Sequence, residues 1–296
     1  MRAAIDRLRR ELLGARNADG AWGYYRGKSS RLEPTCWTLL ALSTQIDQRP
    51  PPDPDPAIAW LERCDRANGW LVEHEEWPFN IAYNALATFT LLSRSDAAAA
   101  LGRRLLATVI ASKGLSAPQE NAMRQNNSLQ GWSWIDGTFS WVEPTCWGLL
   151  ALKKARTAGI VDAQAAARID EAERLLIDRS CQPGGWNFGN ASVMRQDLRP
   201  YVPTTALGLL AMQDRRDTDA VRRGLSTLDS RWPEERSASS LGLSLISLGV
   251  HGQPTDRVAQ ALVDHAADAI TFGNHHGLAV ALFALSSLGQ RHVFAL

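Results

Sequence analysis

Two glutamates have the residue type and the setting for acid–base chemistry. Glu33 and Glu143 each open the same five residues, Glu-Pro-Thr-Cys-Trp, and an apolar run follows each copy, "TLLAL" and "GLLAL". A carboxyl group beside an apolar cavity can act as a proton donor, because loss of solvent raises its pKa and keeps the proton bound. Glutamate before proline and threonine is also typical of a helix start, since proline at the first helical position costs little. Both roles stay open for each glutamate, and the pattern favours the helix start.

The surrounding sequence repeats one plan six times. Each copy has a turn rich in glycine and tryptophan, a polar stretch, and a leucine-rich run that is apolar nearly all round; the last two copies lack most of the turn. Between the copies lie amphipathic stretches, with apolar residues at helical spacing on one face and charges on the other. These stretches are residues 3–16, 56–64, 96–113, 163–178, 219–228 and 256–270. The pattern predicts six helical hairpins, each with one amphipathic and one buried helix.

Six such hairpins either stack as an open solenoid or close into a ring. An open solenoid needs polar end repeats, whereas the sixth copy, "HHGLAVALFALSSLG", is as apolar as the middle copies. We therefore expect an all-α fold, a closed (α/α)6 toroid of twelve helices in six hairpin repeats, formed by residues 1–296 as a single domain. The buried helices would then wall an apolar central cavity.

Aligning the six copies on their leucine-rich runs places one residue of each at the same rim of the expected ring. These residues are Glu33, Tyr83, Glu143, Pro203, Ser239 and His276. Helix N-termini meet at this rim and favour carboxylates and anionic ligands. Because the sixth repeat neighbours the first in a closed ring, we expect His276 beside Glu33 and no histidine beside Glu143. The catalytic candidates are thus Glu33, Glu143 and His276, with Glu33 ionised and Glu143 the proton donor.

Aromatic and arginine side chains near the starts of the buried helices are candidates for substrate binding. They are Tyr24, Tyr83, Trp134, Trp141, Arg195, Arg199 and Tyr201. Aromatic faces stabilise carbocations, which suits an isoprenoid or another hydrophobic small molecule. Two arginines close in sequence can hold a phosphate or diphosphate. An ordinary core has similar aromatic residues and an ordinary surface loop similar arginines, so these structural readings stay open.

The turns and the runs after them resemble a known repeat family. The turn from Asn17 to Trp22, the Gly184-Gly185-Trp186 turn and the run "TCWTLLAL" look like the prenyltransferase and squalene oxidase repeats of squalene–hopene cyclases, oxidosqualene cyclases and protein prenyltransferase β subunits. The resemblance covers essentially the whole chain, and it implies the α/α toroid fold.

The functional motifs of that family match only in part. Class II cyclases place their proton donor in an Asp-x-Asp-Asp-Thr motif, and the resemblance implies that position for Glu33 or Glu143, although the chain has no two consecutive aspartates. Protein prenyltransferases bind zinc through Asp, Cys and His, and Pro34 stands where the histidine would be. Two hypotheses follow. One is a class II terpene cyclase-like or prenyltransferase-like enzyme with neither metal nor cofactor; the other is a non-catalytic toroid that binds a lipid or a protein.

Composition and charge exclude some classes of partner. Lys and Arg total 32 against 31 Asp and Glu, and the paired arginines are scattered, so nucleic acid is not expected as a partner. The sequence has no signal-peptide-like start and no run of about 20 apolar residues, so we expect a cytoplasmic protein, with a peripheral membrane or protein partner left open. The four cysteines form no CxxC pair and suit buried free thiols. Residues 72–77, "VEHEEW", have metal-ligand residue types, but the pattern favours a solvated loop.

Overall fold

Helices form almost all of the regular structure. The computed structural model describes residues 1–44, 55–66, 69–74, 78–94, 98–118 and 124–296, and within these ranges it has twelve α-helices and one short β-hairpin. The helices are α1 (Arg2–Gly14), α2 (Leu32–Ser43), α3 (Asp55–Cys64), α4 (Ile81–Leu92), α5 (Ala98–Ala111), α6 (Val142–Thr157), α7 (Ala163–Asp178), α8 (Val202–Ala211), α9 (Asp219–Arg231), α10 (Ala238–Val250), α11 (Asp256–Thr271) and α12 (His275–Ser286). The hairpin strands are β1 (Ser192–Val193) and β2 (Gln196–Asp197), and a 3₁₀ turn spans Trp232–Glu234.

Amphipathic and fully buried helices alternate along the chain. In α2, all residues from Leu32 to Leu42 are buried, whereas α1 buries only Ile5, Leu8 and Leu12. The same contrast holds between α12 and α11. The amphipathic helices match the stretches predicted from the sequence to within one helical turn at each end, so the predicted hairpin plan is confirmed.

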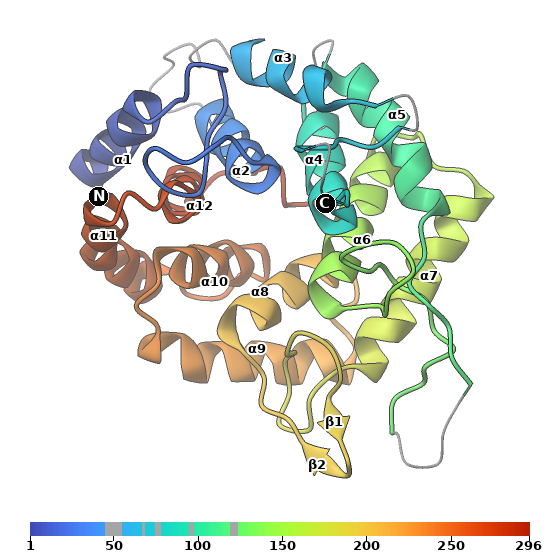
Figure 1. Cartoon of the computed structure of the whole chain (residues 1–296). Coiled ribbons are helices and arrows are strands. Elements are labelled where there is room, and N and C mark those ends of the chain that lie inside the picture. Colours follow the sequence, from blue (N-terminus) through green and yellow to red (C-terminus); the bar gives the residue numbers. More distant parts are fainter. Residues whose placement is uncertain (45–54, 67–68, 75–77, 95–97, 119–123) are drawn as a thin grey trace. The chain divides into compact units, whose positions relative to one another are not determined.

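The contacts divide the chain into two compact units. Unit 1 comprises Met1–Trp77 and Trp232–Ala295, and unit 2 comprises Pro78–Arg231 with Leu296. Within unit 1, α12 packs against α2, α1 and α10, so the last hairpin touches the first (Figure 1). Within unit 2, α4 packs against α5 and α6, and α6 also packs against α7 and α8. The expected contact between the first and sixth repeats is confirmed, and the single domain stays a prediction.

A threonine in the first turn of a buried helix holds the tryptophan turn that precedes the helix. Two of these threonines belong to Glu-Pro-Thr, and the third, Thr205, follows Val-Pro-Thr. In three repeats the backbone N–H of the turn tryptophan donates to this threonine's Oγ1, at 3.0–3.1 Å, and the indole N–H donates to a carbonyl of the preceding amphipathic helix at 2.7 Å. The tryptophan, threonine and carbonyl residues are Trp22, Thr35 and Leu12; Trp132, Thr145 and Val109; and Trp186, Thr205 and Leu176. These tryptophans are buried, and each joins its turn to the preceding amphipathic helix.

The close contact between the turn and this threonine requires glycine in two repeats. A Cβ atom added at Gly131 would lie 2.2 Å from Thr145 Oγ1, and one at Gly185 would lie 2.6 Å from Thr205 Oγ1. Any larger residue would displace the threonine hydroxyl. The glycine–tryptophan turn and the threonine are therefore one structural unit.

Candidate functional site

In three of the buried helices, α4, α6 and α12, the first N–H group donates to a backbone carbonyl of the next repeat. This bond joins Ile81 to Trp134 at 2.8 Å, Val142 to Phe188 at 2.9 Å, and His275 to Tyr24 at 2.9 Å. Helix α2 is different, because its first N–H, on Leu32, donates to the carboxylate of Glu73. A carboxylate is favourable at this position, since helix N-termini carry partial positive charge. Glu73 therefore caps α2.

Because Glu73 fills the capping position, the Glu33 carboxylate is held by other groups. Its Oε2 accepts a hydrogen bond from the Tyr24 hydroxyl at 2.6 Å, and its Oε1 lies 3.4 Å from Nε2 of His276. Tyr24 comes from the first turn and His276 from the first turn of α12, so two repeats meet at this carboxylate. The predicted placement of His276 beside Glu33 is confirmed.

We call Tyr24, Arg31, Glu33, Glu73 and His276 the Glu33 cluster. Arg31 pairs with Glu73 at 2.9 Å, and its guanidinium carbon lies 6.0 Å from the centre of the Tyr24 ring. The side chains of Glu33 and His276 are 10% and 20% exposed. The carboxylate is thus largely desolvated but still reachable, which is the setting that an acid or base needs.

Aromatic rings lie against this cluster. Trp37 follows Glu33 by one helical turn, and its ring centre lies 6.3 Å from that of His276 and 6.2 Å from that of Phe283. Phe294 stacks on Trp37, with ring centres 5.6 Å apart and an angle of 23° between the planes. Trp37, Phe283 and Phe294 are buried. The interior beside the carboxylate is therefore apolar and aromatic.

Two adjacent histidines in α12 have different environments. His275 is buried, and its Nδ1 lies 2.9 Å from the carbonyl oxygen of Gly23. Burial lowers the pKa of His275, although the Gly23 carbonyl opposes this shift. His275 thus serves the packing between the sixth and first repeats, while His276 faces the carboxylate.

The corresponding helix start in unit 2 is built without a carboxylate cap. Val142 donates to a backbone carbonyl, and the Glu143 side chain is half-buried rather than buried. One turn further on, burial and then the Glu143 charge raise the pKa of the Cys146 thiol. Cys146 is therefore a protonated core residue and not a nucleophile.

The predicted substrate-binding residues fall into four places. Tyr24 belongs to the Glu33 cluster, and Tyr83 contacts Trp134 edge to face with ring centres 5.7 Å apart. Three more lie together in a cleft of unit 2; they are Trp141, Arg199 and Tyr201. Arg195 lies at the turn between β1 and β2 and is not among the residues that line this cleft. The two arginines predicted to hold one phosphate together are thus separated.

The cleft in unit 2 has a volume of about 520 Å³. Its walls are Trp141, Asn187, Phe188, Gly189, Asn190, Val193, Asp197, Leu198, Arg199 and Tyr201. Trp141 and Tyr201 are the residues immediately before α6 and α8, so two helix N-termini approach the cleft. Phe188, whose carbonyl receives the first N–H of α6, had no signal in the sequence that marked it as a binding residue.

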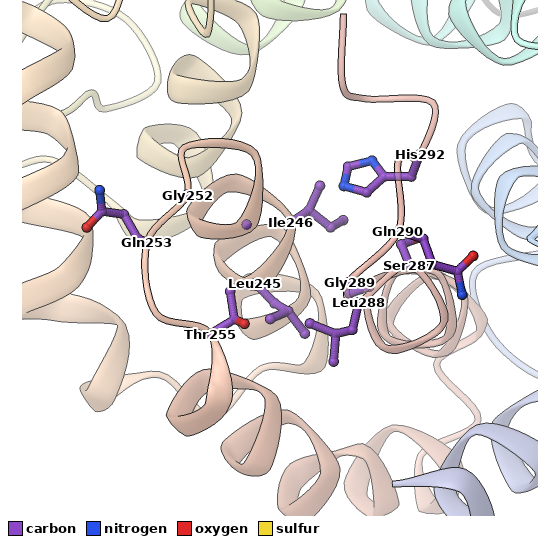
Figure 2. Close-up of a pocket in the computed structure, with 12 residues that line it drawn as sticks. Leu245, Ile246, Gly252, Gln253, Thr255, Ser287, Leu288, Gly289, Gln290 and His292 are labelled. Carbon is purple, nitrogen blue, oxygen red and sulfur yellow. The ribbon is translucent and has the colours of Figure 1, made fainter.

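A second cavity, in unit 1, lies at the C-terminal ends of α10 and α12. It has a volume of about 380 Å³, and Figure 2 labels most of its lining residues, among them Ile246, Ser287 and His292. Its described lining contains no carboxylate. In unit 1 the two acidic side chains of the Glu33 cluster, Glu33 and Glu73, therefore lie away from this cavity, at the N-terminal end of a buried helix.

The cysteines and the described part of the acidic loop, residues 72–74, form no metal-binding group. All four cysteines are buried thiols outside any disulfide, and burial raises the pKa of Cys64 to about 12 and of Cys181 to about 11. Across the described ranges, no group of three or more His, Cys, Asp or Glu side chains is placed to hold an ion. The expectation that no metal is bound stays a prediction. In the predicted solvated loop, Glu73 is instead a cap, and Glu75 and Glu76 lie outside the described residues.

Comparison with known proteins gives the fold but no family. No family model matches the chain, and no curated protein matches it in sequence. Solved structures match along nearly its whole length. An inactive variant of an α-1,6-mannanase from Salegentibacter, in complex with α-1,6-mannotetrose, has a TM-score of 0.66 at 8% identity, covering 96% of this chain and 98% of that one. An α-amylase from Clostridium perfringens has a TM-score of 0.64 at 10% identity, with coverage of 96% and 98%.

A type II terpene cyclase from Scytonema, MstE, has a TM-score of 0.57 at 14% identity, covering 96% of each chain. The chain has an α/α toroid fold. At these identities the likeness carries no substrate, because one fold supports unrelated chemistry. The neighbours include both a terpene cyclase and glycan-processing enzymes, so the terpenoid resemblance is one of several. Among the described residues, no helix combines the length and the apolarity needed to cross a bilayer.

Proposed function

We propose that the chain is an acid–base enzyme that isomerises an isoprenoid or similar polyene, with Glu33 as the group that transfers the proton. The proposal rests on one observation, that Glu33 does not cap the helix at whose start it lies. Glu73 occupies the N-terminus of α2, and Glu33 is left between the Tyr24 hydroxyl and His276. A carboxyl group that only stabilised a helix start would not need either partner.

The proposed reaction balances without a cofactor. The Glu33 carboxyl gives its proton to one carbon of a substrate C=C bond, whose π electrons form the new C–H bond. A second C=C bond of the same substrate attacks the resulting cation and forms a C–C bond. A neighbouring carbon then loses a proton to the Glu33 carboxylate, which restores the acid and leaves an isomer of the substrate.

Each neighbour of Glu33 has a role in this scheme. The Tyr24 hydroxyl donates a hydrogen bond to one oxygen of the Glu33 carboxyl group. Nε2 of His276 lies 3.4 Å from the other oxygen, where its N–H can hydrogen-bond to the carboxylate that proton transfer leaves. The buried Trp37 ring beside His276 excludes water from this side of the carboxyl group, and the low local dielectric strengthens the hydrogen bonds there. We therefore assign the proton-donor role to Glu33 and not to Glu143, for which the repeat register predicted it.

The test is turnover of acyclic polyenes in D₂O. Purified protein is incubated with squalene, geranylgeraniol or farnesol, and the organic extract is examined by gas chromatography and mass spectrometry. We expect an isomer that carries deuterium, and a loss of about 10²- to 10⁴-fold in its rate for Glu33→Gln. Glu143→Gln is the matched control and should keep most of the activity.

Two outcomes would contradict the proposal. One is equal turnover by the wild type and Glu33→Gln. The other is the absence of product from every polyene while native mass spectrometry shows a retained hydrocarbon or a bound protein. The second result would favour the non-catalytic toroid instead.

A further inference from the structure

Several large apolar side chains that remain exposed converge on the cleft in unit 2. They are Phe188, Val193, Leu198 and Tyr201, which are 47%, 46%, 38% and 51% exposed. They come from the turn before the hairpin, from the hairpin, and from the segment before α8 (Figure 1). Exposed apolar surface that gathers in one concave place, rather than scattering, is characteristic of a binding site.

Aromatic rings shape this apolar surface. The Phe188 and Tyr201 rings lie 5.1 Å apart between centres at an angle of 34°. The Phe139 ring packs edge to face against the Trp141 ring, with ring centres 5.5 Å apart and an angle of 90° between the planes. A Cβ atom added at Gly189 would lie 3.2 Å from the Trp141 ring. The walls are thus fixed by packing, and they leave room for a ligand with a flat or chain-like apolar body.

The charge of the cleft favours an anion. Arg199 is exposed and makes no hydrogen bond or ion pair with any described residue, whereas the acidic Asp197 is paired with Arg124 at 2.6 Å. Tyr201 directly precedes α8, whose N-terminus adds partial positive charge beside the cleft, whereas Glu143 in the first turn of α6 opposes the partial charge of that helix. One unpaired guanidinium therefore lies in an apolar cleft whose carboxylate is paired with Arg124.

From this combination we infer that the cleft binds an amphipathic anion, a phosphate or carboxylate joined to an apolar body. Arg199 would bind the anionic oxygens with two parallel hydrogen bonds, and Phe188 and Tyr201 would cover the body. A volume of about 520 Å³ suits a ligand of small-molecule size. The inference shares no residue with the Glu33 cluster, and it holds or fails independently of the proposed isomerase activity.

The experiment is isothermal titration calorimetry of the full chain with four probes below their micellar concentrations. They are octyl phosphate, octanoate, inorganic phosphate and octan-1-ol. We expect saturable binding of one octyl phosphate or octanoate per chain, with phosphate and octan-1-ol at least tenfold weaker. Octyl phosphate bound more tightly than octanoate would assign a phosphate ligand, and the reverse order a carboxylate.

Arg199→Gln and Arg195→Gln form a matched pair of exposed arginines, one inside the cleft and one outside it. Arg199→Gln should weaken binding by about ten- to a hundredfold, because it removes hydrogen bonds to a charged group, and Arg195→Gln should change it less than twofold. Tyr201→Ala should also weaken binding, and Glu33→Gln should not. Equal affinity of the two arginine variants would overturn the inference. So would phosphate binding as tightly as octyl phosphate, since that would indicate an adventitious ion only.

Discussion

Helices α2 and α6 begin with the same five residues, yet their first turns have different surroundings. Both hold a turn tryptophan through the same threonine hydroxyl, at 3.1 Å in each case. Their first N–H groups differ, since that of α2 donates to the Glu73 carboxylate and that of α6 to the Phe188 carbonyl. As a result Glu33 is buried between Tyr24 and His276, whereas Glu143 is half-buried. The repeated five residues thus give both helices the same backbone start, and residues from other segments determine the surroundings of each glutamate.

The two helices also differ at their other ends, and this difference should have the largest effect on stability. In α6, Lys153 is buried and pairs with Glu173 at 2.7 Å and with Asp214, whereas the corresponding residue of α2, Ser43, is exposed. Removing one partner of a buried ion pair leaves an uncompensated charge. Lys153→Met should therefore lower the free energy of unfolding by about 3–5 kcal/mol, and Ser43→Met by less than about 0.5 kcal/mol.

Urea denaturation followed by circular dichroism measures both values. Similar midpoints for the two variants would mean that the Lys153 network adds no more stability than an exposed serine. A pH series adds a second readout. Burial raises the pKa of Asp214, but hydrogen bonds from Lys153 and Arg156 outweigh that and hold it below the ordinary value. Because its folded pKa is depressed, Asp214 stabilises the fold above the unfolded-state pKa, about 3.9. That contribution should disappear as the pH falls below this value, and Lys153→Met should lack it.

The hydrogen bond between the threonine hydroxyl and the turn tryptophan should contribute equally to stability at α2 and at α6. Thr35→Val and Thr145→Val each leave the N–H of a buried tryptophan without its acceptor, at a cost of about 1–3 kcal/mol. Thermal unfolding of each single variant gives the two losses, and Thr38→Val, which removes a hydroxyl bonded only within α2, is the control. A clear inequality between Thr35→Val and Thr145→Val would show that the two copies are not equivalent in structure.

The sequence predicted the parts of this comparison that follow from periodicity. The alternation of apolar and amphipathic stretches predicted the hairpins, and the register of the repeats, with closure of the sixth onto the first, placed His276 beside Glu33. These inferences succeed because helical spacing and repeat length are local properties. The roles of Glu73 and Arg31 were missed, because the second repeat departs from the common turn and no pattern indicates which group caps α2.

Two further features had no signal in the sequence. Phe294 stacks on Trp37, but the residues after α12 follow no periodic pattern that would direct them there. The turn of the β-hairpin places Met194 and Arg195 at φ values of 49° and 64°, where Asn or Gly is usual. A search for the usual turn residues therefore finds no hairpin, and the separation of Arg195 from Arg199 could not be anticipated.

The Glu73 cap predicts a smaller difference between the two helix starts. Glu73→Gln keeps the size of the side chain but removes the charge at the N-terminus of α2 and the ion pair with Arg31. We expect a loss of about 1 kcal/mol, together with a smaller effect at high salt, since screening weakens charge interactions at partly exposed sites. Glu143→Gln should change stability by less than half of that amount. Chemical denaturation at low and high salt measures both variants, and equal losses would remove the distinction between the two starts.

The smallest expected effect concerns the pH dependence of the contact between the first and sixth repeats. Burial lowers the pKa of His275 in the folded state, so the unfolded chain binds a proton more readily. Stability from this residue is therefore complete above the unfolded-state pKa, about 6.5, and declines as the pH falls below it. His275→Asn should flatten the slope of stability against pH between about pH 6.5 and 5. His265→Asn, a change at a more exposed histidine of α11, is the control. If His275→Asn keeps the wild-type slope, then the protonation of this buried ring does not weaken the packing between the two repeats that hold Glu33.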